Sequence, residues 1–409
     1  MTERAEVDDG GACDPSPGRP GDNGAPARER VLGVDAARGL ALLGMLAVHV
    51  TETLRSDSTP SHTQEFVAGH ALATFVLLAG VSLAFTTGRR AAATGARWPD
   101  RGTAAALATR GVLIGVLGLV LNLTDPPAEV ILPYYGAMFV LAIPLVRLAS
   151  RTLIVLSAAL VVVAPLVVLG SFGIDLPDDE PTVTSLMHPL TVITPLLVSG
   201  SYPAVEYMAF LCVGLVLGRL DLSSLRVAAR IAAAGAALGL AAWLTSGLLL
   251  LRLGGLAGLR DAAPAGLTAE QARNVILWDP DTTQTWWWLA ERAPYTVTPL
   301  RMLHDLGVAT AVLGCCLVLA RILRRPGVMW PLVAAGSMTL TLYTAHILVL
   351  ASGLLEDHPV LLYVAMAVGA LTFATIWRLT RAQGPLEARV SRSCHWARER
   401  VERGASSRP

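Results

Sequence analysis

The chain alternates between long apolar runs and short polar segments. Beyond residue 29, runs of about 17 to 22 mostly apolar residues recur, each close to the length of a helix that crosses a bilayer. Ten such runs predict ten membrane-spanning helices, at residues 31–50, 69–87, 104–123, 130–147, 152–171, 203–219, 228–250, 302–323, 331–352 and 359–379. We therefore expect an all-α, polytopic membrane domain over residues 30–380.

The two ends of the chain are polar. Residues 1–29 are rich in Gly, Pro, Asp and Arg and have no apolar core, so they predict a disordered tail and not a signal peptide. Residues 381–409 are rich in arginine and are expected to form a second cytoplasmic tail.

Composition agrees with a membrane protein. Hydrophobic residues make up 53% of the chain and charged residues 15%. The mean hydropathy is +0.55, which is too apolar for a soluble protein of 409 residues. The net charge of +1 gives no basis for binding nucleic acid, and the five cysteines show no spacing typical of a metal site. We expect no disulfide and no bound metal.

Arginine placement predicts the orientation. With the N-terminus inside, 25 arginines fall in the inner segments and 6 in the outer ones, leaving aside Arg38 within the first run. An excess of basic residues marks cytoplasmic loops. Both termini are therefore expected in the cytoplasm, with the protein in the cell membrane.

Three polar side chains interrupt the first apolar run, RVLGVDAARGLALLGMLAVHV. On a helix, Arg38 and His49 lie about 20° apart around the axis, and Asp35 and His49 about 40° apart. The three side chains thus share one stripe, which reaches from near the start of the helix to its far end. Because such groups are costly in lipid, the stripe must face protein or a wet cavity.

Histidines concentrate on the outer side in this topology. Four lie in or beside spans: His49, His70, His304 and His346. A lone membrane histidine most often makes a hydrogen bond between helices. Several converging on one leaflet instead favour a shared pocket, in which a histidine could take and return a proton near neutral pH.

Other polar positions could line the same pocket. Glu206 opens the sixth span near its outer end, one turn after Tyr202, and could equally be an interfacial acid that reaches water. Tyr343 and His346 share one helix face with Thr339, at spacings of three, four and seven residues, in a structural or functional stripe. His304 and Asp305 are adjacent and do not share a face, which argues against a direct pair.

Two polar segments between spans carry further chemistry. Trp286, Trp287 and Trp288 in the longest outer loop are typical of an interfacial anchor, or could form a lid or a platform for a sugar. The inner loop between the second and third spans is rich in arginine. The excess of arginine primarily indicates that this loop lies on the inner side of the membrane. The same arginines could also hold the phosphates of a coenzyme, and they are Arg89, Arg90, Arg97, Arg101 and Arg110.

These residues carry a resemblance to a known family. Asp35, then Arg38-Gly39, then His49 resemble the first helix of the membrane acyltransferase superfamily. HALATFVLLAGVSLAF (70–85) resembles the second helix of its heparan-alpha-glucosaminide N-acetyltransferase-like branch. Later segments, 201–222 and 337–350, are similar to bacterial, actinobacterial-type members of that branch.

The resemblance implies acyl transfer across the membrane. Cytosolic acyl-CoA, with acetyl-CoA as the expected donor, would acylate a hydroxyl or amine of a glycan or glycolipid of the cell envelope. A histidine at the position of His49 is the proposed base in one branch, whereas the heparan-type branch has asparagine there and a histidine in the following loop, where this chain has His62. We predict His49, His62 and His70 as catalytic candidates. Six further residues would line the donor channel or substrate site: Asp35, Arg38, Glu206, His304, Tyr343 and His346.

Two other functions would also place polar groups in the membrane. A transporter would need them along its pathway, but no clear inverted repeat and no matched pair of broken spans is visible in the sequence. A non-catalytic scaffold or sensor would use its histidines only to join helices. Transfer from labelled acetyl-CoA would distinguish the enzyme from both.

Overall fold

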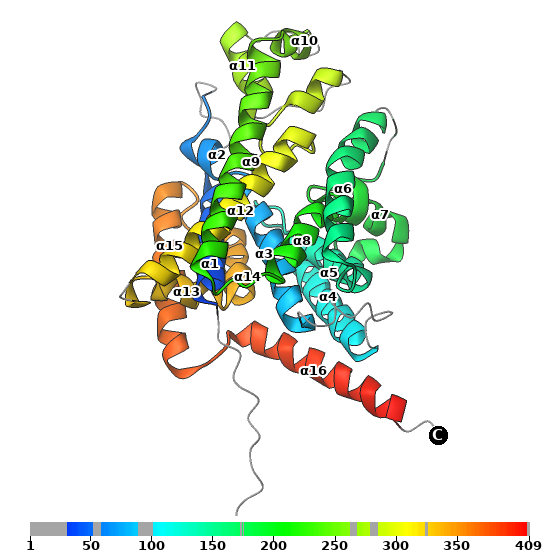
Figure 1. The fold of residues 1–409 in the computed structure, drawn as a ribbon, viewed down its shortest axis with the longest axis vertical. Helices are drawn as coiled ribbons and strands as arrows, with labels where there is room; N and C mark the ends of the chain where they lie inside the picture. The colour runs from blue at the N-terminus through cyan, green and yellow to red at the C-terminus, as the bar shows by residue number, and fades with distance from the viewer. Residues whose placement is uncertain are drawn as a thin grey trace, which may run out of the picture. The chain divides into compact units, whose positions relative to one another are not determined.

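The computed structural model describes residues 31–51, 59–88, 101–171, 174, 176–261, 268–278, 285–323 and 326–406, and within them it contains helices and no β-strand (Figure 1). In chain order the elements are α1 (Leu32–Val50), α2 (His62–Phe66), α3 (His70–Thr87), α4 (Arg101–Leu121), η1 (Asn122–Thr124), α5 (Leu132–Leu145), α6 (Ser150–Gly170), η2 (Thr184–Met187), α7 (Pro189–Thr194), η3 (Pro195–Ser199), α8 (Ala204–Gly218), α9 (Leu225–Leu251), α10 (Gly255–Arg260), α11 (Ala269–Trp278), η4 (Trp286–Ala290), α12 (Pro299–Ile322), η5 (Pro326–Val328), α13 (Trp330–Gly336), α14 (Thr339–Ala351), α15 (Pro359–Thr380) and α16 (Pro385–Ser406).

The apolar runs form helices long enough to cross a membrane. Among the described residues, seven helices meet the length and composition of a span, and two bent helix pairs raise the number to nine. The fourth run forms the shorter helix α5. The prediction of an all-helical, multi-pass domain is confirmed, whereas the count of ten spans and the sidedness of the termini stay predictions.

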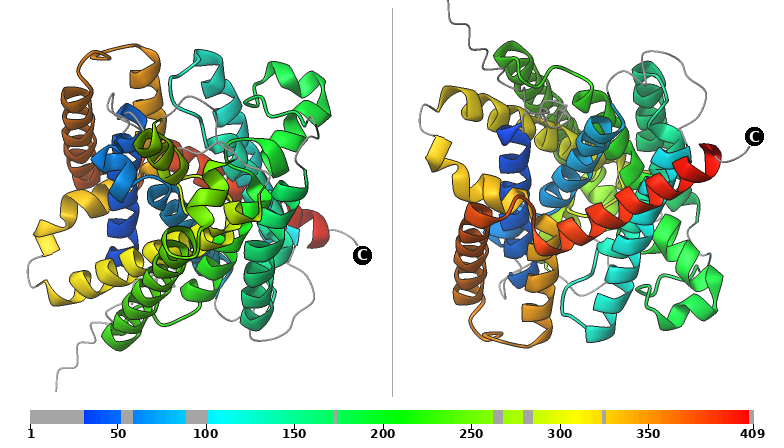
Figure 2. Two further views of the ribbon diagram at one scale, coloured as in Figure 1. Left: turned by 90° about the horizontal axis from the view of Figure 1, so that it is seen from above. Right: turned by 90° about the horizontal axis from the view of Figure 1, so that it is seen from below.

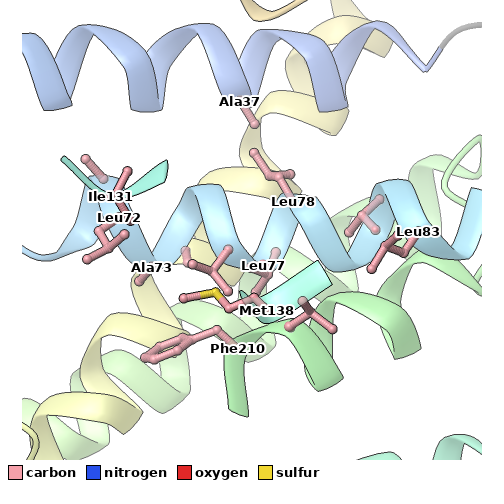
Figure 3. Close-up of a cluster of buried hydrophobic side chains, with 14 of the residues drawn as sticks. Ala37, Leu72, Ala73, Leu77, Leu78, Leu83, Ile131, Met138 and Phe210 are labelled. Atoms are coloured by element: carbon pink, nitrogen blue, oxygen red, sulfur yellow. The ribbon is translucent and has the colours of Figure 1, made fainter. Parts of the chain in front are cut away.

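Helix α3 packs against three others, namely α1, α8 and α12. Figure 3 shows Ala37 of α1 facing Leu78 of α3, and both side chains are fully buried. On another face of α3 the helix α8 approaches so closely that a Cβ on Gly214 would lie 2.0 Å from the carbonyl oxygen of Leu77. Small residues permit such approach between membrane helices. The result is a tightly packed centre from which polar side chains can be held in place.

The ninth predicted span is broken. Helices α13 and α14 meet at Ser337–Met338 with a bend of 83°. Helix α13 packs on α1, and a Cβ on Gly336 would lie 1.7 Å from the carbonyl oxygen of Asp35. Only glycine fits there. The close contact places the break, and hence the first turn of α14, beside the polar stripe of α1.

The Arg-rich tail contains a long helix. Helix α16 packs along α4 and reaches α14 with its first turn. Figure 2 shows it (red) crossing under the other helices in the view from below. At the outer loop, Trp288 is buried at 1% exposure against Leu250 and Leu259, whereas Trp286 is 74% exposed. The tryptophan run thus divides between a small core and the surface.

Candidate functional site

The polar stripe of α1 begins with an ion pair. The Nη1 of Arg38 lies 2.6 Å from Oδ1 of Asp35, one turn earlier on the same helix. The Nη2 of Arg38 donates to Oγ of Ser82 on α3. The pair is mostly buried, so the guanidinium supplies the charge that an intramembrane carboxylate requires.

The far end of the stripe meets a second histidine. The Nδ1 of His49 lies 2.9 Å from Nε2 of His346 on α14, and the two rings are stacked. Tyr343, one turn earlier on α14, packs edge-on against His346, and its hydroxyl accepts a hydrogen bond from the backbone amide of Ile131. Two spans nearly 300 positions apart in the sequence thus place two imidazoles and a phenol together.

A separate polar cluster forms at the start of α3. The Nδ1 of His70 lies 2.6 Å from Oδ1 of Asp305, and Arg301 holds the same carboxylate through its Nε and Nη2, both at 2.8 Å. Asp305 was not among the predicted site residues, because its partner lies on another helix. The spacing of Arg301 and Asp305, four residues apart on one helix, was the available signal.

Arg301 also anchors the outer loop. Its Nη1 donates to the carbonyl oxygen of Arg292, and its Nη2 donates to that of Ala68. Tyr295, in the loop between these contacts, has a φ of 64°, a left-handed conformation that a tyrosine rarely adopts. Burial raises the pKa of Tyr295 to about 12. The loop is thus held in a strained conformation that places this ring at the site.

Two cavities lie near His49, which lines the smaller of them. The inner cavity has a volume of about 230 Å³ and extends from Arg38, Arg110 and Glu387 at one end to Tyr343. The outer pocket is about 20 Å³, and its walls include His49, Glu129, Tyr202 and Tyr295. Both are lined by the same three residues at their junction: Met45, Ile131 and Tyr343. The two cavities therefore share a wall, and His49 lines the outer pocket beside it.

The inner cavity carries unpartnered polar groups. The hydroxyl of Tyr135 is buried and has no hydrogen-bond partner among the described residues, and the same holds for Nε of Arg110. The guanidinium of Arg110 lies over the ring of Phe139, 5.3 Å from its centroid. A buried polar group without a partner is costly, so these two groups require water or a polar or anionic ligand in the cavity.

An acidic and aromatic cluster adjoins Tyr202, which lines the outer pocket. The carboxylate of Glu180 accepts hydrogen bonds from Tyr134 at 3.1 Å and from Ser201 at 2.7 Å. Burial raises the pKa of Glu180, and the hydrogen bond from Ser201 opposes this shift. Tyr202 packs edge-on against both Tyr134 and Tyr295. The wall of the inner cavity contains Arg38, Arg110 and Glu387, whereas the charged residue in the wall of the outer pocket is Glu129.

The remaining predicted residues are placed differently. The side chain of His62 is 80% exposed and lines neither cavity. His304 bonds the carbonyl oxygen of Gly239 and lines an apolar groove between α9 and α12, although its ring also contacts His70. Glu206 is buried at 5% exposure. The coenzyme-phosphate candidates Arg89, Arg90 and Arg97 lie outside the described residues.

The described residues contain no group of three or more metal-ligating side chains that could hold an ion.

The sequence matches the family model of the catalytic domain of heparan-alpha-glucosaminide N-acetyltransferase over residues 30–248. No curated protein matches the chain. The matched range includes α1, α3 and the residues Glu129, Tyr202 and Glu206.

Proposed function

Because the chain belongs to the family of heparan-alpha-glucosaminide N-acetyltransferase catalytic domains, a family of membrane acetyltransferases, we propose that it acetylates an acceptor across the membrane. The donor is acetyl-CoA from the cytosol, and the acceptor is a hydroxyl or amine of a sugar or glycolipid of the cell envelope. The observation that carries this proposal is the junction of the two cavities at Met45, Ile131 and Tyr343, beside His49.

The donor arm enters through the inner cavity. Arg38 and Arg110 offer positive charge at the end nearest α16, which suits the phosphates of coenzyme A. The hydroxyl of Tyr135 is available for an amide of the pantetheine arm. Along α1, Arg38 and His49 are about 16 Å apart, so the arginine binds the donor and takes no part at the reacting carbon.

His49 acts as the base. We assign the hydrogen to Nδ1 of His49, which lies 2.9 Å from Nε2 of His346, so that Nε2 of His49 is the basic nitrogen and the contact fixes the plane of the ring. The acceptor O–H or N–H gives its proton to His49 while its oxygen or nitrogen bonds to the thioester carbon. The C–S bond then breaks, and the proton passes to the sulfur, so that coenzyme A leaves as the free thiol.

Tyr343 stabilises the charge that develops on the carbonyl oxygen. Its hydroxyl accepts a hydrogen bond from the Ile131 amide, so its own hydrogen is available at the junction of the cavities. A donor fixed before the reaction begins lowers the barrier to a tetrahedral intermediate. Burial of the site keeps water away from the thioester.

The test uses purified protein in sealed vesicles. Acetyl-CoA labelled in the acetyl group is supplied on the side of α16, and label is scored on acceptor glycans on the other side and as free acetate. Transfer or slow hydrolysis that disappears in His49→Ala supports the enzyme. Passage of intact donor or acceptor with no loss of the acetyl group indicates a transporter, and no turnover of any kind indicates a scaffold.

A further inference from the structure

A carboxylate of the chain itself occupies the first turn of α14. Glu387 of α16 accepts a hydrogen bond from the backbone amide of Thr341 at 3.0 Å and one from its hydroxyl at 2.6 Å. Thr341 is the third residue of α14, so this amide is one that the helix cannot bond internally. An anion is stabilised there by the free amides and the helix dipole.

The same carboxylate faces the positive end of the inner cavity. Glu387 lines the cavity together with Arg38 and Arg110, and its charge interacts with that of Arg110. The Nε of Arg110 is nevertheless buried without a hydrogen-bond partner among the described residues. The positive groups and the helix amide thus form one anion-binding surface, which Glu387 occupies in part.

We propose that this surface is a phosphate subsite of the inner cavity, and that Glu387 is an internal competitor which the phosphate must displace. The inference rests on the proposed function, because the phosphate that fits is one on acyl-CoA. An anionic lipid headgroup of the inner leaflet carries the same chemistry and is the other source.

Displacement requires little rearrangement. Rotation of the Glu387 side chain about its own bonds releases the α14 amide, while α16 stays packed on α4. Leu386 retains its backbone hydrogen bond to the hydroxyl of Thr341 at 3.1 Å, which fixes the start of α16. The bound phosphate would then contact Thr341, Arg110 and Arg38 in place of the carboxylate.

The decisive variant is Glu387→Gln, which keeps an oxygen for the Thr341 amide and removes the charge. Glu402→Gln, on the same helix and paired with Arg398 at the surface, is the matched control. We expect Glu387→Gln to bind coenzyme A about fivefold or more tightly, measured by calorimetry, a size typical of coupling between sites. Arg110→Gln should weaken binding about tenfold.

Three further measurements test whether the effect of Glu387→Gln depends on phosphate. Pyrophosphate alone should raise the melting temperature of Glu387→Gln more than that of the unchanged protein. Acetyl-pantetheine, which lacks phosphate, should show the same KM with both proteins. Vesicles of neutral or of phosphatidylglycerol-rich lipid identify the source, since a headgroup in the subsite would weaken coenzyme A binding only in the anionic vesicles.

Failure is distinguishable from failure of the proposed function. Suppose that coenzyme A binds and that Arg110→Gln weakens this binding, but that neither Glu387→Gln nor Glu387→Ala tightens it. The proposal that Glu387 competes with the phosphate is then wrong, and the proposed donor site is supported. If pyrophosphate stabilises Glu387→Gln but neither the variants nor the unchanged protein bind coenzyme A, the proposed anion-binding surface is supported and the proposal of acetyl-CoA as donor is wrong. If neither ligand binds any variant, both proposals are wrong.

Discussion

The Nδ1 of His49 lies 2.9 Å from Nε2 of His346, so one imidazole donates a hydrogen bond to the other inside the membrane domain. The contact couples the two tautomers, because only one of the two facing nitrogens can carry the shared hydrogen. His346 is 4% exposed, and His49 lines the outer pocket.

Loss of the base should reduce chemistry more than binding. We expect His49→Ala to keep its expression and affinity for coenzyme A and to lower turnover about 100-fold or more, as is usual when a general base is removed. His62→Ala should retain nearly full turnover, because that side chain is exposed and lines neither cavity. Steady-state acetyl transfer would measure both. A large loss in His62→Ala with little loss in His49→Ala would assign the base to the loop.

Asp35 and Arg38 should show coupled effects on stability. Arg38→Gln removes the guanidinium that lies 2.6 Å from the Asp35 carboxylate and leaves the acid in a poorly solvated position. We expect each single change to lower the yield of folded protein and Asp35→Asn with Arg38→Gln to restore part of it. Size-exclusion recovery and melting temperature would measure this. A double variant no better than the worse single variant would exclude a stabilising pair.

Cysteine labelling should test the orientation. In a background without the native cysteines, Thr184→Cys should react with an impermeant thiol reagent added outside intact cells, and Arg400→Cys should react only after the cells are opened. Both positions are exposed, so accessibility depends on the side of the membrane. The reverse pattern would place the outer pocket in the cytoplasm and contradict the proposed direction of transfer.

Tyr295 should combine backbone strain with acceptor binding. At a φ of 64°, glycine is the one residue that adopts this conformation freely, so Tyr295→Gly should be more stable than Tyr295→Ala by about 1 kcal/mol. Both changes remove the ring from the outer pocket and should raise the acceptor KM alike. Thermal unfolding and kinetics separate the two effects. Equal melting temperatures for Tyr295→Gly and Tyr295→Ala would contradict backbone strain at this position.

Glu291 should make stability fall as the pH rises. It is 1% exposed, both carboxylate oxygens lack hydrogen-bond partners among the described residues, and burial raises its pKa to about 8 from an ordinary value of 4.5. Between these two values the unfolded chain loses this proton and the folded protein keeps it, so stability decreases with increasing pH.

Glu291→Gln removes this dependence. The melting temperature of the variant should exceed that of the unchanged protein by more at pH 8 than at pH 5, by a few degrees. Glu129→Gln is a suitable control, because it makes the same substitution at an exposed carboxylate. Parallel pH profiles for Glu291→Gln and the unchanged protein would contradict a buried neutral carboxyl.

The apolar runs were sufficient to predict the class of fold, because membrane helices must satisfy their backbone hydrogen bonds internally. The break between α13 and α14 was not predictable in this way. Residues 331–352 form one continuous apolar run, and the bend depends on contact of Gly336 with Asp35 of another helix. Helix α16 was also missed as a structural element, since a polar, Arg-rich segment gives no apolar signal and its packing surface is α4.

The site was partly accessible from the sequence. The spacing within α1 placed Asp35, Arg38 and His49 on one stripe, because helical geometry alone determines it. It could not show that His49 meets His346 or that His70 meets Asp305, since both pairs join different helices. The phosphate-binding interpretation of the basic loop extended to Arg110, but the contribution of Glu387 depends on how α16 packs.

The 83° bend makes α14 an independent short rod of 13 residues. Thr341 at one point of this rod contacts Glu387, and His346, about 7.5 Å further along its axis, contacts His49. Because α14 is one short helix, a change in its tilt moves Thr341 and His346 together. Because Thr341 and His346 belong to one short helix, any displacement of its first turn would also change the distance between His346 and His49.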